Sequence, residues 1–245
     1  MRLISWRAGN KATPVESPPV ADGHRSSEPG NCMICVRFDT LGETWINLVH
    51  VTLQAGLSAD SDYYELLGVR VSFPAAADQA DALVVQYGDS RLVAEMEKVF
   101  FSDAPNSLGH SYASLMSGPD GRRDLQDIID LLRARPSSKR AVVTLCGSGN
   151  GKVPCVNAVQ FLRRKGQLQT MYFARGQDAY RKFYADGLCV AKMAQRVASA
   201  LDLPAGTVEG FIGSSHVYQR DREAIDRFLL QGRSFLRKND ENGGS

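Results

Sequence analysis

The sequence predicts an α+β domain, a mixed β-sheet packed with helices on one face. Segments that alternate like strands and segments with helical spacing follow one another without a regular β-α repeat. With 245 residues, of which 43% are hydrophobic, the chain is long enough to bury one large core. No internal repeat divides it. We therefore expect one domain built around one sheet.

Local patterns place the elements along the chain. In chain order they predict a helix over 44–55, a strand over 63–73, a candidate strand over 82–86, helices over 92–101 and 124–135, a buried strand over 141–146, a hairpin of 156–162 and 168–173, a helix over 187–201, a strand over 208–212 and a helix over 220–230. The first helix ends at Gly56. The helix over 124–135 stops before Pro136, because the residue before a proline avoids helical geometry. The helix over 187–201 is long and apolar and is expected at the centre of the domain.

The two ends of the chain have a different composition. Residues 1–31 are rich in proline, serine and glycine and show little apolar periodicity, which predicts a disordered leader. Residues 239–245 predict a disordered tail. The expected ordered domain therefore covers 32–238.

The net charge, the apolar runs and the cysteine count give expectations for partners and for the cellular compartment. A net charge of +2 gives no electrostatic reason to expect a nucleic-acid polymer or a membrane as partner. No apolar run approaches the length of a membrane span, and the N-terminus lacks the apolar core of a signal peptide. Five cysteines without a dense framework suit a reducing compartment, so we expect the cytoplasm.

Reactive and ligand-binding residues follow in one order between 153 and 218. They are Pro154-Cys155, Arg175, Asp178, Asp186 and His216-x-Tyr218. A thiolate can add to C6 of a pyrimidine ring, which turns C5 into a carbon nucleophile. It needs nearby positive charge to lower its pKa, and Arg175 is the expected source. Taken alone, Cys155 would more often be a buried core residue.

These residues resemble the thymidylate synthase superfamily, which includes the pyrimidine 5-hydroxymethylases. The matching groups are Pro154-Cys155 with Gln160-Phe161 and Gly166; Arg175 with Asp178; Leu201-Asp202-Leu203 with Gly206; and Gly213 with His216-x-Tyr218. They fall in register without gaps from Cys155 to Tyr218, and weaker matches extend upstream to about Glu43. The resemblance implies a layered thymidylate-synthase-like fold, a homodimer formed sheet to sheet, a pyrimidine nucleotide as substrate and 5,10-methylenetetrahydrofolate as one-carbon donor.

The resemblance also implies roles for the charged residues. Arg175 would hold the nucleotide phosphate, and Lys139-Arg140 would reach into the phosphate site of the partner subunit. A solvated basic turn is the other interpretation of Lys139-Arg140. Glu95 matches the glutamate that organises water for proton transfer at C5, although Glu97 is equally available.

Asp186 stands where uracil-using members carry asparagine. A carboxylate accepts a hydrogen bond from the exocyclic amine of cytosine, so the resemblance points to a cytosine nucleotide. The other interpretation is that Asp186-Gly187 caps the helix that follows. His216 and Tyr218 alternate on an extended segment, so both face one side, where the family binds the sugar.

The folate region departs from the family pattern. Asp178 matches the residue that contacts the pterin, but Arg181 and Lys182 stand where the family has an apolar residue and a glycine. The expected tyrosine is replaced by Leu108, with Tyr112 close by. No phosphate-binding arginine is evident within 58–63, and no C-terminal segment that would close over folate is evident after Arg237.

Two further motifs predict no metal or phosphate site. Cys32-Met33-Ile34-Cys35 has metal-ligand spacing but no second pair, so no metal is expected. Gly147-Ser148-Gly149-Asn150-Gly151-Lys152 lacks the P-loop spacing and is expected to be a flexible loop before Cys155.

The sequence thus predicts a one-carbon transferase that most closely matches a cytidylate (CMP or dCMP) 5-hydroxymethylase with Cys155 as nucleophile. Two alternatives stay open: a thymidylate synthase that acts on dUMP, and a family member that binds a nucleotide without turning it over.

Overall fold

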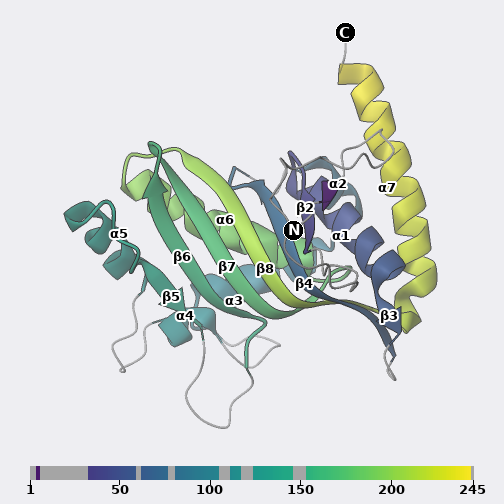
Figure 1. Cartoon of the computed structure of the whole chain (residues 1–245), viewed down its shortest axis with the longest axis horizontal. Coiled ribbons are helices and arrows are strands. Elements are labelled where there is room, and N and C mark those ends of the chain that lie inside the picture. Colours follow the sequence, from purple (N-terminus) through teal and green to yellow (C-terminus); the bar gives the residue numbers. More distant parts are fainter. Residues whose placement is uncertain are drawn as a thin grey trace, which may run out of the picture.

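The computed structural model describes residues 4–5, 33–58, 62–76, 81–104, 111–116, 124–145 and 153–243 (Figure 1). The strands are β1 (Ile4–Ser5), β2 (Ile34–Arg37), β3 (Leu57–Ser58), β4 (Tyr63–Pro74), β5 (Val142–Thr144), β6 (Val156–Arg164), β7 (Gln167–Asp178) and β8 (Ala205–Tyr218). The helices are α1 (Leu41–Ala55), α2 (Ala82–Tyr87), α3 (Ser90–Phe101), α4 (Tyr112–Met116), α5 (Leu125–Ala134), α6 (Phe183–Ala200), the 3₁₀ turn η1 (Gln219–Asp221) and α7 (Arg222–Gly243).

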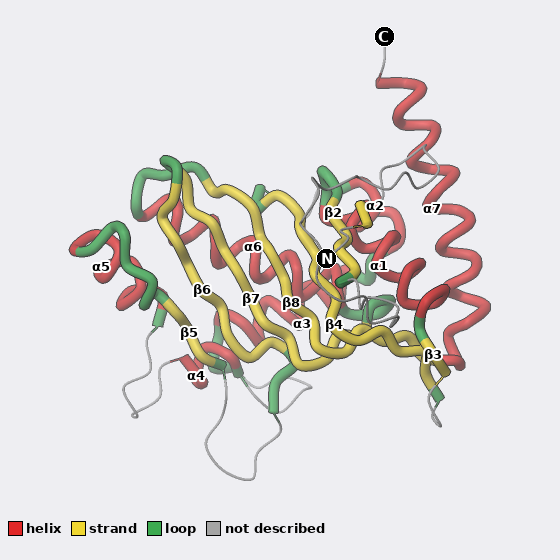
Figure 2. The backbone as a smooth tube through the Cα atoms, in the orientation of Figure 1, coloured by secondary structure: helices red, strands yellow, loops and turns green. Residues whose placement is uncertain are grey.

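The described strands form one mixed sheet in the order β1-β2-β4-β8-β7-β6-β5, with β3 paired to β4. The long strands β4, β8, β7 and β6 lie side by side at its centre, and α5 and α7 lie beyond opposite sides (Figure 2). Strands β4 and β8 are antiparallel, whereas β7 and β8 are parallel and are joined through α6. The sheet is therefore mixed, as the sequence predicted.

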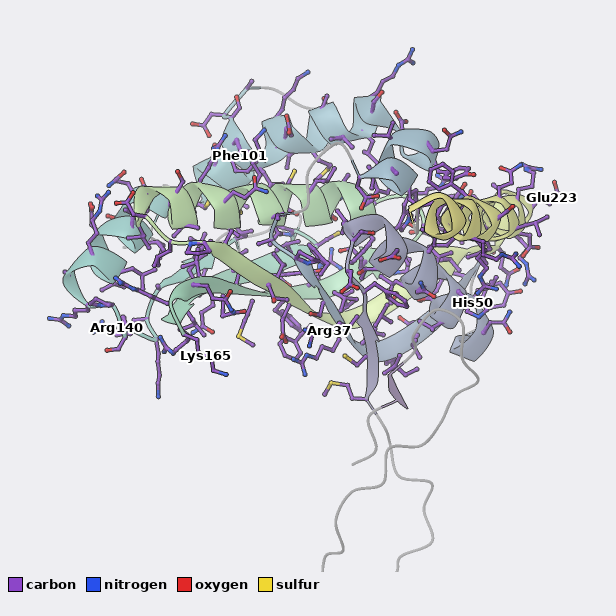
Figure 3. All side chains as sticks on the ribbon, turned by 90° about the horizontal axis from the view of Figure 1, so that it is seen from above. Arg37, His50, Phe101, Arg140, Lys165 and Glu223 are labelled. Carbon is purple, nitrogen blue, oxygen red and sulfur yellow. The ribbon has the colours of Figure 1, made fainter. Side chains whose placement is uncertain are left out.

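The described helices cover one face of the sheet. Helix α6 lies along this face, α3 packs on α6, and the opposite face has no described helix over it (Figure 3). Large side chains from both layers fill the space between them: Trp45, Phe73, Phe161 and Phe183 are all at most 1% exposed. Of the described helices, none is long and apolar enough to cross a membrane. The predicted α+β class with one covered face is confirmed.

Most predicted elements are present with small shifts of their ends. The hairpin of β6 and β7 turns at Lys165 and Gly166, whose φ angles of 49° and 74° are those of a tight turn matched to the strand twist. The apolar helix predicted over 187–201 is α6, which begins at Phe183. All but a few of its side chains are buried, in agreement with its predicted central place.

Two predictions at element level differ from the structure. Residues 82–87 form the helix α2, not a strand, because the Asp81 carboxylate accepts hydrogen bonds from the backbone N–H groups of Leu83 and Val84 and caps the helix. The short apolar run at 82–86 could not distinguish a short helix from a strand by its period. Helix α7 begins at Arg222 and continues to Gly243, past residue 230, where the sequence predicted the end of this helix.

On the neighbouring strands β4, β8 and β7, the alternation of side chains between the two faces of the sheet is interrupted at the same level. On β4, β8 and β7 the paired residues Val69, Ile212 and Ala174 face the helices. The next positions that face the helices are Leu66, Ser215 and Gln177, three residues away on each strand. A regular strand repeats every two residues, so all three strands are kinked together. Gly68, with a φ of 69°, lies at the kink.

The kink determines to which face of the sheet the side chains at the end of β8 point. Beyond it, Ser215 faces α1, where its hydroxyl is 2.7 Å from that of Thr52. His216 and Tyr218 consequently face the side without described helices. Without the kink, their facing would be reversed.

Gly210 leaves space for a buried ring, and its replacement should destabilise the fold. A Cβ at Gly210 would lie 2.3 Å from the ring of Tyr172, its neighbour on β7. We expect Gly210→Ala to lower the free energy of unfolding by about 1–3 kcal/mol, the usual cost of overpacking. Urea unfolding followed by circular dichroism measures this.

Gly176→Ala is the matched control, because its Cβ would meet no atom closer than 3.9 Å. Its unfolding midpoint should stay at or slightly above that of the unchanged protein. Equal midpoints for the two variants would contradict the assigned packing of Tyr172.

Candidate active site

Cys155 lies at the point where the chain enters β6. Its carbonyl accepts a hydrogen bond from the backbone N–H of Arg175 on β7, at 2.9 Å. The Asn157 amide donates to the carbonyl of Pro154 at 3.0 Å. The Arg175 guanidinium donates to the carbonyls of Pro154, at 3.1 Å, and of Val153, at 2.7 Å. The segment that carries the thiol is therefore fixed by Arg175 of β7 and by Asn157 of its own strand, while Cys155 itself stays partly exposed.

The charges around Cys155 differ from those that the sequence predicted. Burial raises the pKa of the Cys155 thiol, and the positive charge of Lys182 opposes this more than any other group. Arg175, the expected source of positive charge, lowers this pKa less, and its guanidinium is engaged by the two backbone carbonyls. The negative charges of Asp186 and Asp178 raise the pKa of the thiol. Lys182 is thus the main cation of the site.

Asp186 is a buried acid beside this thiol. It is 2% exposed and lies in the first turn of α6. One of its carboxylate oxygens accepts a hydrogen bond from the Gln177 amide at 3.0 Å, and the other lies 3.6 Å from the Lys182 ammonium. The N-cap of α6 is Lys182, so Asp186 does not cap this helix. The capping interpretation is wrong.

Two acceptor atoms in this cluster have no hydrogen-bond partner among the described residues. They are Oδ1 of Asp186 and Oε1 of Gln177, and both are fully buried. Buried polar atoms are nearly always satisfied, so unsatisfied ones mark either strain or a place where a ligand binds. The Lys182 ammonium, 3.6 Å away, compensates the charge of Oδ1 of Asp186 in part.

Tyr112 on α4 completes this group. Its side chain is buried, and its hydroxyl is hydrogen-bonded by the backbone at Cys155 and Val156. Burial, with the nearby charges of Asp186 and Cys155, raises the pKa of Tyr112. In the sequence Tyr112 stands out only as a tyrosine close to Leu108, since nothing in its local pattern separates it from a core aromatic residue.

Asp178, His216 and Tyr218 form a second group further along the same strands. Asp178 is paired with His216 across β7 and β8. The His216 ring lies 5.4 Å from that of Tyr218 and 5.8 Å from that of Tyr63. The predicted common facing of His216 and Tyr218 is therefore present in the structure. Asp178 lies three residues beyond Arg175, about 10 Å along the strand, so this group borders the thiol.

Lys139 and Arg140 do not converge on Cys155 within one chain. Both are exposed residues in the turn before β5, and the neighbouring Ala141 carbonyl accepts a hydrogen bond from the N–H of Phe161. Phe161 lies six residues along β6 from Cys155, which corresponds to about 20 Å. If these cations serve an active site, it belongs to another subunit.

The two glutamates of α3 are ion-paired elsewhere. The carboxylate of Glu95 lies 3.6 Å from the ammonium of Lys98, and that of Glu97 lies 2.8 Å from the ammonium of Lys192. Neither is among the groups with the largest effect on the pKa of Cys155. The role predicted for Glu95 remains a prediction.

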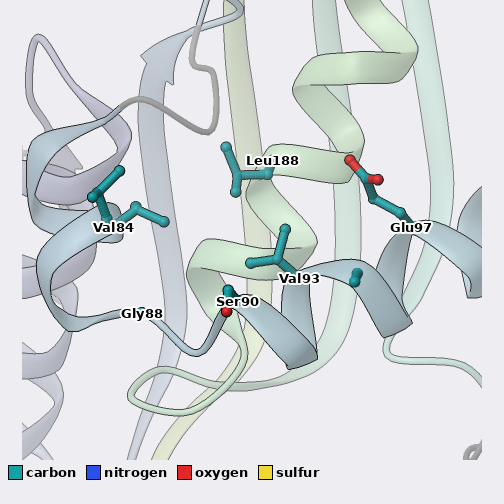
Figure 4. A pocket seen from close by; sticks show the side chains of 8 residues that line it. Val84, Gly88, Ser90, Val93, Glu97 and Leu188 are labelled. Atoms are coloured by element: carbon teal, nitrogen blue, oxygen red, sulfur yellow. The ribbon is translucent and has the colours of Figure 1, made fainter.

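A cavity of about 310 Å³ lies away from the thiol, between α2, α3 and α6. Val84, Val93 and Leu188 line it, and Glu97 stands at its side (Figure 4). Leu188 follows Asp186 by two residues, which is about 200° around the helix. The cavity therefore opens on the face of α6 opposite to Asp186 and does not lead to Cys155.

The residues at the thiol fit a folate in one respect. Asp178 uses Oδ1 to accept hydrogen bonds from the backbone N–H groups of Tyr180 and Arg181, at 3.1 and 2.8 Å. Its second oxygen makes no hydrogen bond with a described residue and can accept one from a pterin N–H.

No group of three or more metal-binding side chains occurs in the described part of the chain. Cys32, Leu108 and the loop at 147–152 lie outside the described residues.

The sequence is similar to one known family of proteins. The family model described as thymidylate synthase matches residues 88–235, more than half of the chain. A putative thymidylate synthase of Methanocaldococcus jannaschii is 27% identical over 119 residues, which are 44% of this chain and 54% of that protein. A putative thymidylate synthase of Methanothermobacter marburgensis is 22% identical over 189 residues, 74% of this chain and 81% of that protein.

Proposed function

The chain belongs to the thymidylate synthase family, and we propose that it transfers a one-carbon unit to C5 of a pyrimidine nucleotide through a covalent bond between Cys155 and C6. The observation that carries this proposal is the setting of Cys155, a partly exposed thiol on a fixed segment beside Lys182, Arg175 and Asp186. A cysteine with a purely structural role needs no such charges. The family acts on pyrimidine nucleotides, which supplies the substrate class.

The chain's own residues would carry most of the reaction. The Cys155 thiolate adds to C6, and Arg175 and Lys182 face the negative charge of thiolate and phosphate. Tyr112 holds its hydroxyl against the backbone of Cys155 and fixes the wall of the site. His216 and Tyr218 meet the sugar, and Glu95 organises water for removal of the C5 proton. Bound methylenetetrahydrofolate, held in part by Asp178, supplies the one-carbon unit.

We propose a cytidylate (CMP or dCMP) as the substrate because of Asp186. Its Oδ1 has no hydrogen-bond donor among the described residues and can accept from the exocyclic amine of cytosine. Family members that use cytosine make a hydroxymethyl product, so hydroxymethylation is the proposed outcome. Both relatives are named as putative thymidylate synthases, which favours the alternative, thymidylate synthesis from dUMP. A nucleotide-binding protein without catalysis would have no use for the thiol.

We propose a homodimer that buries the face of the sheet without described helices. Phe173 is 46% exposed on this face, and Met171 and Phe211 lie on the same side of their strands. Lys139 and Arg140 would then enter the phosphate site of the partner subunit, which explains why they lie about 20 Å from Cys155 in their own chain. The three described cysteines are free, which supports the cytoplasm as the proposed compartment.

Hydrogen exchange at C5 tests the covalent step directly. Addition of Cys155 to C6 loosens the C5–H bond, so tritium at C5 of CMP or dCMP should pass to water. We expect exchange with the unchanged protein and a loss of at least about a thousandfold with Cys155→Ala, because the nucleophile is absent. Tritium release is counted with and without methylenetetrahydrofolate, and dUMP is the third substrate.

Absence of exchange from all three nucleotides, with binding still detectable, would refute the proposed function and leave a binding protein. Exchange from dUMP alone would refute the cytidylate assignment.

Asp186→Asn should change the choice of base. The asparagine amide offers both a donor and an acceptor, which suits uracil better than the carboxylate does. We expect the ratio of kcat/KM for dCMP to that for dUMP to fall by about tenfold or more, since one hydrogen bond contributes about 1–3 kcal/mol of discrimination. An unchanged ratio would remove Asp186 from base recognition.

Mixing two inactive variants tests the shared phosphate site. One variant is Cys155→Ala, and the other is Lys139→Ala/Arg140→Ala. In a mixed dimer one of the two sites combines Cys155 of one subunit with both cations of the other. Random reassembly should therefore restore about a quarter of the activity, from the symmetry of a two-fold dimer. If the double variant alone is fully active, the cations have no part in the site.

A further inference from the structure

Lys182 is an unfavourable residue for its position. It is the N-cap of α6, where serine, threonine, aspartate or asparagine is preferred. Its side chain makes no capping hydrogen bond. A cation at the N-terminus of a helix also opposes the helix dipole. Helix stability therefore does not explain this lysine.

The side chain of Lys182 bends back over the first turn of α6. Its ammonium lies 3.6 Å from Oδ1 of Asp186, four residues later, and only 21% of the side chain is exposed. Asp186 in turn is held from the strand side by Gln177. The ammonium is thus held beside a buried carboxylate, and its charge acts on the Cys155 thiol.

Charged and titratable groups from three elements surround the thiol. They are Lys182 and Asp186 on α6, Arg175 and Asp178 on β7, and Tyr112 on α4. Of the two cations, Arg175 donates to backbone carbonyls at 2.7 and 3.1 Å. The Lys182 ammonium has three donors, and Asp186 is the acid paired with it in the described part of the chain. Lys182 therefore has donor capacity for a negative group in the site.

We propose that Lys182 is a catalytic residue whose ammonium stabilises first the Cys155 thiolate and then the negative charge that the pyrimidine ring acquires, with Asp186 as the positioning residue that holds it. The second half of this proposal rests on the proposed function. The first half concerns the protein without substrate and stands by itself.

The electrons and protons balance without a further reactant. The thiol proton leaves to solvent, and the sulfur lone pair forms the S–C6 bond. The C5=C6 electron pair then moves to the C4–C5 bond, and the C4=N3 pair of cytosine moves onto N3 (in uracil, the C4=O pair moves onto O4), so that the negative charge passes from sulfur to the ring. A fixed ammonium beside both places stabilises the charge throughout, in a site with little water to screen it.

The state of Lys182 agrees with this role. Burial tends to lower the pKa of Lys182, but Asp186 and Cys155 together outweigh burial and raise it. The lysine therefore remains charged at neutral pH. Removal of its charge should make the Cys155 thiolate harder to form.

Alkylation of Cys155 by iodoacetamide in the ligand-free protein tests the proposal, because only the thiolate reacts. The rate is measured from pH 6 to 10 by mass spectrometry of the peptide that contains Cys155. For Lys182→Met we expect the inflection to move up by one pH unit or more, and the rate at pH 7 to fall about tenfold, since one pKa unit changes the thiolate fraction tenfold. Lys182→Arg should stay within about threefold of the unchanged protein, because the charge is kept.

Lys192→Met is the matched control on the same helix. It also removes a cation from an ion pair, with Glu97 at 2.8 Å, but ten residues further along α6, about 15 Å away. Its alkylation profile should match that of the unchanged protein. The proposal is overturned if the pH dependence of Cys155 alkylation in Lys182→Met equals that of the wild-type protein. It is also overturned if Lys192→Met shifts this pH dependence as much as Lys182→Met does.

A double variant keeps the test valid if Lys182→Met alone does not fold. Lys182→Met/Asp186→Leu removes the buried carboxylate together with its partner, which avoids an unpaired buried charge. Because loss of Asp186 by itself favours the thiolate, Asp186→Leu is the reference for this variant. Alkylation that is about tenfold slower in the double variant than in Asp186→Leu supports the proposal, and equal rates overturn it.

The C5 exchange assay separates this inference from the proposed function. An alkylation shift without exchange in the unchanged protein would support Lys182 as the thiolate-stabilising cation and refute the pyrimidine chemistry. Exchange in the unchanged protein without an alkylation shift would support the pyrimidine chemistry and overturn the role of Lys182.

Discussion

The joint kink of β4, β8 and β7 is the constraint on which the site depends. Both ladders are interrupted at this level, where Gly213 is paired neither with Gly68 nor with Arg175, but the register of the strands is the same on the two sides of the kink. Up to Ala174, side chains of β7 alternate between the helix layer and the face without described helices. After the kink, Gln177 faces α6 and Asp178 faces the side without described helices. The kink thereby distributes polar residues of a single strand end to both sides of the sheet, next to a cysteine at the start of β6.

On the face of the sheet that the helices cover, burial determines which charges are paired and how the pKa of the thiol is shifted. Asp186, Gln177 and Tyr112 lie in the core layer, where an unpaired charge is expensive, so the carboxylate is retained only with a cation and a hydrogen-bond donor beside it. Lys182 supplies that cation at a cost to helix capping. The same low polarity raises the pKa of Cys155 and makes the thiol sensitive to each nearby charge. Stability and reactivity are therefore coupled in one small group of residues.

Much of the fold could be predicted from the sequence, and the failures have identifiable causes. Periodicity located α1, α3, α5, α6 and the hairpin of β6 and β7, because each buries one face or is buried throughout. It failed at 82–86, where the side-chain cap by Asp81 determines the structure of a segment too short to show a period. The spacing of His216 and Tyr218 predicted a shared facing, which β8 has. It could not predict which face this is, because that depends on a kink whose single local mark is the glycine at 68.

The sequence by itself determined the class of fold and the family and proposed a set of reactive residues, since these follow from hydrophobic period and from motifs in fixed order. Only the tertiary structure decided how the charges are shared. It engages Arg175 with the carbonyls before Cys155, buries Asp186 inside a helix and brings Lys182 to the thiol from the far end of β7. In the sequence alone, Lys182 is merely a departure from the family pattern. The physical reason is that charge interactions depend on distance and burial between residues remote in the chain, and neither is encoded in local spacing.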